Sequence, residues 1–97
     1  MMVSCVTPIA LLPARQIKTI EGLGTESAPG VVQRAFIEEQ AAQCGYCTNG
    51  MVMAAKALLA KTPRPTAAQV KDALADTLCR CGTHTRILRA VLRASQA

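Results

Sequence analysis

The sequence has almost no aromatic residues. Its 97 residues include no tryptophan, one tyrosine and one phenylalanine. The core must therefore be built from aliphatic side chains and methionine, and so small a core is marginal without a metal or a partner. The scarcity also counts against nucleic-acid binding, despite a net charge of +5, because stacking platforms for bases are missing. A basic surface equally suits an acidic protein surface or an anionic cofactor.

The sequence also lacks an export signal and a long apolar run. Its start, MMVSCVTPIALLPAR, has no early positive region and meets Pro8 and Pro13 too soon for a signal peptide. No run approaches the roughly twenty apolar residues of a membrane span. We therefore expect a cytoplasmic protein, with a periplasmic location through a partner's signal left open. In that setting, clustered cysteines indicate metal binding rather than disulfides.

Hydrophobic periodicity predicts four helices in residues 31–97. Their segments are VVQRAFIEEQAAQ, TNGMVMAAKALLAK, TAAQVKDALAD and THTRILRAVLRAS. We expect Thr48 to be the N-cap of the second, which must end at TPRP because proline cannot continue a helix. The third opens with Thr66 and Gln69 at capping-box spacing. The result is a predicted all-α fold.

The last predicted helix has two different sides. Ile87 and Val91 lie one turn apart and are expected to face the core. Arg86, Arg89 and Arg93 share the other side. This basic face is a candidate docking surface for a partner.

Residues 1–30 differ from the rest of the chain. The pieces around 6–11 and 16–20 are short and partly β-like, and we expect them to pair as a hairpin. A lone two-stranded hairpin is barely stable, so this region would lean on something else. The predicted architecture is a four-helix bundle in residues 31–97, preceded by a short β-hairpin-like remnant.

Four of the five cysteines form two tight pairs. Cys44 and Cys47 are spaced C-x2-C, and Cys79 and Cys81 are spaced C-x-C. Each pair lies between two predicted helices, so two helix–cysteine pair–helix hairpins would bring all four thiols to one end of the bundle. A helix N-terminus follows each pair, and its partial positive charge stabilises thiolates.

Glycines accompany both pairs. Gly45, Gly50 and Gly82 would allow tight turns and close approach of backbone amides to sulfur. His84 could be a fifth ligand, but four thiols already complete a site, so a surface histidine is favoured. Cys5 stands alone and reads as a small buried or free thiol.

Four thiols can hold different groups. They suit one tetrahedral Zn²⁺ ion, or a [2Fe–2S] cluster with two thiolates for each iron. Reduced structural thiols are a third possibility. The C-x-C pair is awkward around one small ion and suits two adjacent irons better, so the spacing favours the iron–sulfur cluster.

The segments VVQRAFIEEQAAQCGYCTNGMVMAAKALL and LCRCGTHTRILRAV resemble the iron–sulfur subunit of the xanthine oxidase family of molybdenum hydroxylases. The ending CRCGTHTRI is most similar to the isoquinoline or nicotinate oxidoreductase and aldehyde dehydrogenase small subunits. The resemblance runs over residues 4–94. Such subunits have a plant-type ferredoxin domain with its own cluster, then a four-helix domain with a second cluster beside the molybdenum cofactor. This sequence matches the second part.

The resemblance implies specific roles. Cys44, Cys47, Cys79 and Cys81 would ligate the inner [2Fe–2S] cluster. Gln43 would hydrogen-bond the pterin of a molybdopterin cofactor held by a partner subunit. Gly45 and Arg80, inside the two cysteine motifs, would complete the cofactor-binding set.

The implied function is electron transfer within an oxidoreductase, in which this chain is a component and not a catalyst alone. A large molybdopterin-binding subunit would be the main partner, with a further electron-transfer subunit or cytochrome as the next acceptor. No nucleic-acid ligand is expected. The alternative is a small zinc-stabilised interaction or nucleic-acid-binding module, supported by the basic charge and the arginine face.

Two departures from the family pattern stand out. The three cysteines of the ferredoxin's C-x4-C-x2-C motif are absent, and SCVTPIALL resembles the strand with its fourth ligand. Residues 1–30 would thus be the remnant of a ferredoxin domain and its linker. Cys5 would be an orphan ligand, and this chain alone would not form the outer cluster. A truncated gene product, a mis-called start and a fragment all stay open. Asn49 replaces the family's usual proline, and we expect only a local effect.

Overall fold

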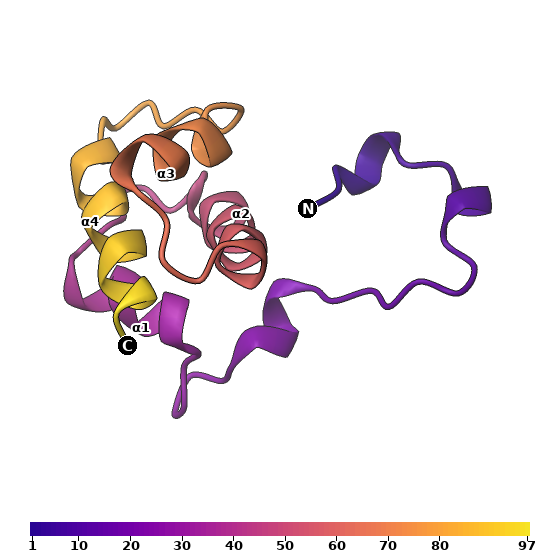
Figure 1. Cartoon of the computed structure of the whole chain (residues 1–97), viewed down its shortest axis with the longest axis horizontal. Helices are drawn as coiled ribbons and strands as arrows, with labels where there is room; N and C mark the ends of the chain where they lie inside the picture. The colour runs from indigo at the N-terminus through magenta and orange to yellow at the C-terminus, as the bar shows by residue number, and fades with distance from the viewer.

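The computed structural model describes all 97 residues and contains helices but no strand (Figure 1). The four α-helices are α1 (Val31–Glu38), α2 (Thr48–Lys61), α3 (Ala67–Leu74) and α4 (His84–Ser95). Three short 3-10 helices precede them, namely η1 (Ser4–Val6), η2 (Ile9–Leu11) and η3 (Ile20–Leu23). The predicted all-α class is confirmed.

The four α-helices pack around one small core. The most extensive contact joins α1 to α4, followed by α2 with α3 and α3 with α4. Helices from the two ends of residues 31–97 therefore lie side by side, and the core is not divided into two separate hairpins. Its members are aliphatic or small, with one aromatic ring: Val32, Ala35, Phe36, Ala41, Met51, Val52, Ala55, Val70, Ile87, Ala90, Val91 and Ala94.

Two predicted helix boundaries are confirmed. Thr66 caps α3: its Oγ1 accepts from the backbone N–H of Gln69 at 3.3 Å, and Gln69 Oε1 accepts from the N–H of Thr66 at 2.8 Å. This reciprocal pair is the capping box. α2 ends at Lys61, just before Pro63, as the TPRP sequence requires.

Two other boundaries differ from the expectation. Cys47, not Thr48, is the N-cap of α2, and the Thr48 hydroxyl oxygen is buried without a hydrogen-bond partner. α1 stops at Glu38 because Gln40 adopts a left-handed conformation with φ of 51°. The N–H groups of Gln40 and Ala41 then bond back to the last turn of α1, in the pattern of a Schellman motif.

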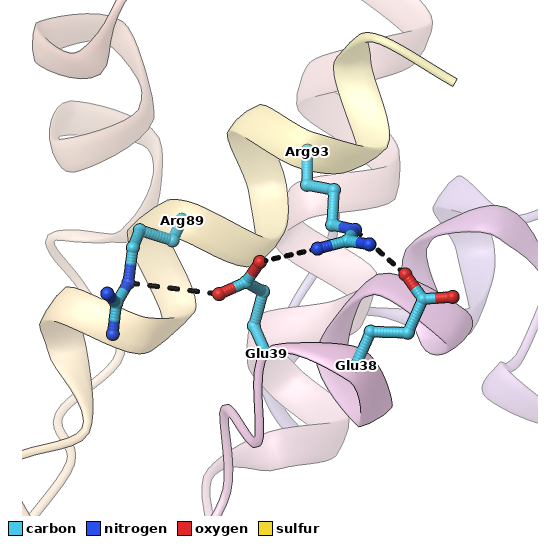
Figure 2. A network of polar contacts seen from close by, with 4 residues as sticks. All are labelled: Glu38, Glu39, Arg89 and Arg93. Carbon is cyan, nitrogen blue, oxygen red and sulfur yellow. Dashed lines mark hydrogen bonds and ion pairs between the residues drawn. The ribbon is translucent and has the colours of Figure 1, made fainter.

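A network of ion pairs joins the end of α1 to α4 (Figure 2). Arg93 contacts Glu38 Oε2 at 2.8 Å and Glu39 Oε1 at 2.9 Å, and Arg89 lies 3.8 Å from Glu39 Oε2. The hydrogen bond with Glu39 and the charge of Glu38 raise the pKa of the Arg93 guanidinium. The predicted arginine face is therefore not one free surface, because two of its three members are paired within the chain and Arg86 is not.

Residues 1–30 contain no buried side chain. Figure 1 shows their first part, in indigo, extending away from the four α-helices. The expected hairpin is absent: residues 6–11 contain parts of two 3-10 helices, and residues 16–19 have no regular secondary structure. Pro8 and Pro13 lack the N–H that a strand ladder needs, and no further strand is present to support a pair. Only Ile20 and Leu23 pack against the core.

The helices are short. None of them combines the length and the apolar character that crossing a bilayer requires.

Candidate metal centre

Two loops carry the paired cysteines. Cys44 and Cys47 lie in the connection from α1 to α2, and Cys79 and Cys81 lie in the connection from α3 to α4. Since α2 and α4 both begin at these loops, the N-terminal ends of two helices are adjacent to the cysteines.

Each loop turns at a glycine. Gly45 has φ of 84° and Gly82 has φ of 75°, in the left-handed region that other residues rarely adopt. The Thr48 N–H bonds to the Gly45 carbonyl at 3.3 Å, and the Gly82 N–H bonds to the Cys79 carbonyl at 3.3 Å. These turns place the two cysteines of each motif on one short arc of backbone. Gly50, the third predicted glycine, lies within α2.

Thiols from the two loops are neighbours. Cys44 and Cys81 are close enough for each side chain to alter the pKa of the other, and the same holds for Cys47 and Cys79. Cys44 is exposed, whereas the other three are half-buried. The tertiary structure thus brings the two cysteine loops near each other, with Cys44 near Cys81 and Cys47 near Cys79; we call these the two crossed pairs.

One member of each crossed pair has a lowered pKa. The Thr83 hydroxyl, followed by the Thr83 backbone N–H, lowers the pKa of Cys79 to about 6. The backbone N–H of Tyr46, followed by the side chain of Cys81, lowers the pKa of Cys44. In both cases the hydrogen bonds favour the thiolate form of the sulfur.

The other member of each pair has a raised pKa. Burial, followed by the Cys79 side chain, raises the pKa of Cys47. At Cys81 a hydrogen bond from the Cys44 backbone favours the thiolate, but the Cys44 thiol, burial and the nearby thiolate charges outweigh it and raise the pKa. A negative charge on one sulfur disfavours ionisation of its neighbour, and a bound cation would compensate that charge.

The donor set fits a two-iron cluster. A single Zn²⁺ ion needs its ligands around one point, with sulfurs about 2.3 Å from the metal. A [2Fe–2S] cluster is larger and takes two thiolates at each of two irons. Four cysteine thiols from two neighbouring loops supply the ligands that such a cluster requires.

Other predicted site residues lie at the surface around these loops. Gln43 and Arg80 are exposed, and neither side chain makes a hydrogen bond or ion pair within the chain. Tyr46, between the first two cysteines, and Leu78, just before Cys79, are 96% and 85% exposed. The surface beside the thiols therefore offers both polar and apolar groups to a second molecule.

The remaining candidates are also exposed. His84 is the first residue of α4 and faces solvent, in line with the favoured surface interpretation. Asn49 is exposed in the first turn of α2. Cys5 is exposed within η1, in the segment that extends away from the helices in Figure 1.

Sequence reasoning missed Thr83, which it used only to mark a helix start. The Thr83 side chain is buried, and its Oγ1 lies 3.2 Å from the Cys79 sulfur. The available signal was the spacing C-x3-T at the start of a helix, where a hydroxyl can turn back toward a preceding cysteine.

The fold and the site define a small all-helical domain whose surface carries a four-thiol centre suited to two irons. The family described as "[2Fe-2S] binding domain" matches residues 19–92, and this chain belongs to that family. The expected iron–sulfur cofactor is thus confirmed. Nothing in the comparisons supports the zinc-stabilised or nucleic-acid-binding alternative.

Named relatives agree with the family. The A subunit of nicotinate dehydrogenase from Pseudomonas putida is 59% identical over 93 residues, covering 96% of this chain and 59% of the relative. The alpha subunit of isoquinoline 1-oxidoreductase from Brevundimonas diminuta is 47% identical, covering 96% of this chain and 60% of the relative.

A solved structure has the same fold. The crystal structure of quinoline 2-oxidoreductase from Pseudomonas putida 86 matches with a TM-score of 0.87 and 33% identity, over 99% of this chain and 60% of that one. The chain therefore spans about three fifths of the length of these relatives.

Proposed function

We propose that this chain is an electron-transfer domain that holds one [2Fe–2S] cluster through Cys44, Cys47, Cys79 and Cys81. The observation that carries the proposal is the placement of the two cysteine pairs in the loops that begin α2 and α4, two helices that contact each other. The family match supplies the identity of the group. When bound, such a cluster takes up and passes on electrons, at a potential set by its surroundings.

The proposal extends to a partner. The names of the relatives refer to oxidoreductases of nicotinate, isoquinoline and quinoline, all of them aromatic rings that contain nitrogen. We propose that the chain serves a molybdenum hydroxylase acting on that class of substrate and relays electrons from the molybdopterin centre of a large subunit toward an external acceptor. A further electron-transfer subunit or cytochrome would receive them. The expected cytoplasmic location belongs to this proposal.

The exposed polar residues of the site support the partner contact. Gln43 and Arg80 have no partner within the chain, although each adjoins a proposed ligand. Gln43 would hydrogen-bond the pterin edge, and Arg80 and Gly45 would lie beside it. The exposed Tyr46 and Leu78 would be covered by the same large partner.

The two regions of the chain have separate roles in the proposal. Residues 31–97 would be the cluster-binding four-helix bundle, built from two helix–cysteine pair–helix hairpins. Residues 1–30 would be the remnant of a ferredoxin domain and its linker, with Cys5 an orphan ligand. The apolar side chains exposed in this segment support its contact with another protein surface.

Metal analysis tests the cluster. Iron, acid-labile sulfide and zinc are measured on the full chain purified without air. We expect about two irons and two sulfides for each chain. One zinc ion without sulfide would replace the electron-transfer proposal with a structural module. A folded chain that takes up no metal, even after reconstitution, would also overturn the proposal.

A separate experiment tests the partner contact. Gln43→Ala is expected to leave the iron and sulfide content unchanged and to weaken association with a pterin-bearing large subunit. Gln96→Ala, which changes an exposed glutamine at the far end of α4, is the matched control. Loss of the cluster in Gln43→Ala would show that Gln43 supports the ligand loop instead.

A further inference from the structure

Thr83 occupies an unusual position at the start of α4. It is the only polar residue among the buried side chains, with 9% of its surface exposed. Its backbone carbonyl accepts the N–H of Ile87 at 3.0 Å, as an N-cap residue should. Its side chain, however, makes no hydrogen bond to the helix.

The hydroxyl of Thr83 faces a proposed ligand. Oγ1 lies 3.2 Å from the Cys79 sulfur, and that sulfur is its one hydrogen-bond partner in the structure. A threonine at an N-cap usually accepts from a backbone N–H of the first turn, which stabilises the helix. Here that interaction is absent, and most buried hydroxyl groups have a hydrogen-bond partner. The local structure has directed this group toward the sulfur.

The other three cysteines have no such neighbour. No side-chain hydroxyl lies within hydrogen-bond distance of Cys44, Cys47 or Cys81, so Thr83 distinguishes one sulfur from the remaining three. A hydroxyl next to a metal ligand acts on the metal through that ligand.

We propose that Thr83 is a positioning residue for electron transfer, whose O–H donates to the Cys79 sulfur and raises the reduction potential of the cluster. The inference rests on the proposed function. Reduction adds negative charge to the iron–sulfur core, and part of this charge resides on the ligand sulfurs. A hydrogen bond to an anionic acceptor strengthens as its charge grows, so the hydroxyl stabilises the reduced state more than the oxidised one.

The test compares side chains that differ only by the hydroxyl. Thr83→Val keeps the shape of threonine, and Thr83→Ser with Thr83→Ala forms a second such comparison. Thr85→Val removes an exposed hydroxyl two residues further along α4 and is the control. The full chain is loaded with its cluster without air, and the reduction potential is obtained from a redox titration followed by visible absorption and electron paramagnetic resonance.

We expect removal of the Thr83 hydroxyl to lower the equilibrium constant for reduction about three- to tenfold, which is about 30 to 60 mV for one electron. The reduction potential should fall in Thr83→Val and Thr83→Ala. In Thr83→Ser and in the Thr85→Val control it should stay near that of the unmodified chain. The g-values of the reduced cluster should change in the same two variants.

The outcomes separate the inference from the proposal beneath it. Iron and sulfide contents are determined on every sample before titration. An unmodified chain without a cluster would overturn the proposed function. If the cluster is present but its reduction potential is the same in Thr83→Val as in the unmodified chain, and the same in Thr83→Ala as in Thr83→Ser, only the role of Thr83 is overturned. If Thr83→Val fails to fold, the serine and alanine variants still differ by a single oxygen and decide the question.

Discussion

The two regions of this chain use apolar residues in opposite ways. Residues 31–97 bury theirs in one core shared by four helices, whereas residues 1–30 bury none. The first region places apolar side chains at helical spacing, so that one face of each helix can pack. The second has a similar wealth of apolar residues, but prolines interrupt them. Its exposed members are Met1, Met2, Val3, Val6, Ile9, Leu11 and Ile17.

This contrast shows that hydrophobic content alone does not make a folded unit. What matters is whether the pattern lets an element hide one face against another within the same chain. The helical region meets this condition and carries the thiol site, whereas the N-terminal segment would need an outside surface. Matched changes in the two regions should therefore have unequal effects.

The largest expected effect concerns the cysteines. Cys47→Ser should abolish the cluster and reduce the helix content, because the binding energy of the metal centre is also folding energy. Cys5→Ser, the same change in the N-terminal segment, should alter neither. Iron content and far-ultraviolet circular dichroism measure both properties. If both substitutions lower the iron content and the helix content equally, the two regions do not differ in function as proposed.

Core packing should give the next largest difference. Ile87 is 2% exposed, and Ile87→Ala should lower the free energy of unfolding by about 2 to 5 kcal/mol. Ile9 is 83% exposed, and Ile9→Ala should change the free energy of unfolding by less than about 0.5 kcal/mol. Denaturant titration of both variants measures the difference. A costly Ile9→Ala would mean that the N-terminal segment is packed in solution.

Deletions locate the border between the regions. Removing residues 1–23 takes away Ile20 and Leu23, which pack on the core, and should cost about 1 to 3 kcal/mol of stability. Removing residues 1–18 leaves both side chains in place and should cost little. Thermal unfolding of the two shortened chains compares them. Equal melting temperatures would mean that the part of the chain that contributes to stability begins after Leu23.

The ion-pair network should have the smallest effect. Glu39→Gln removes the carboxylate that contacts Arg89 and Arg93 and should lower the melting temperature by a few degrees at low salt. The loss should shrink as added salt screens the charges. Glu26→Gln, an exposed glutamate in the N-terminal segment, is the control. A loss that is independent of salt would point to packing rather than charge.

Local rules predicted the helical region well. The Thr66–Gln69 capping box and the end of α2 at TPRP depend on neighbours within a few residues, so the sequence sufficed. The same rules failed for α1, which ends at a left-handed Gln40 that no sequence pattern marks. They also failed for the hairpin, because a strand is stable only with a partner, and none is available in this chain.

The sequence by itself determined the four paired cysteines, the glycines that turn their loops, the helices between them and the family. Only the tertiary structure decided that Cys44 lies near Cys81 and Cys47 near Cys79. It also decided that α4 joins α1 through Arg93 and that the buried Thr83 hydroxyl faces a sulfur. The physical reason is range: helix and turn preferences act over about four residues, whereas these contacts depend on how whole helices pack.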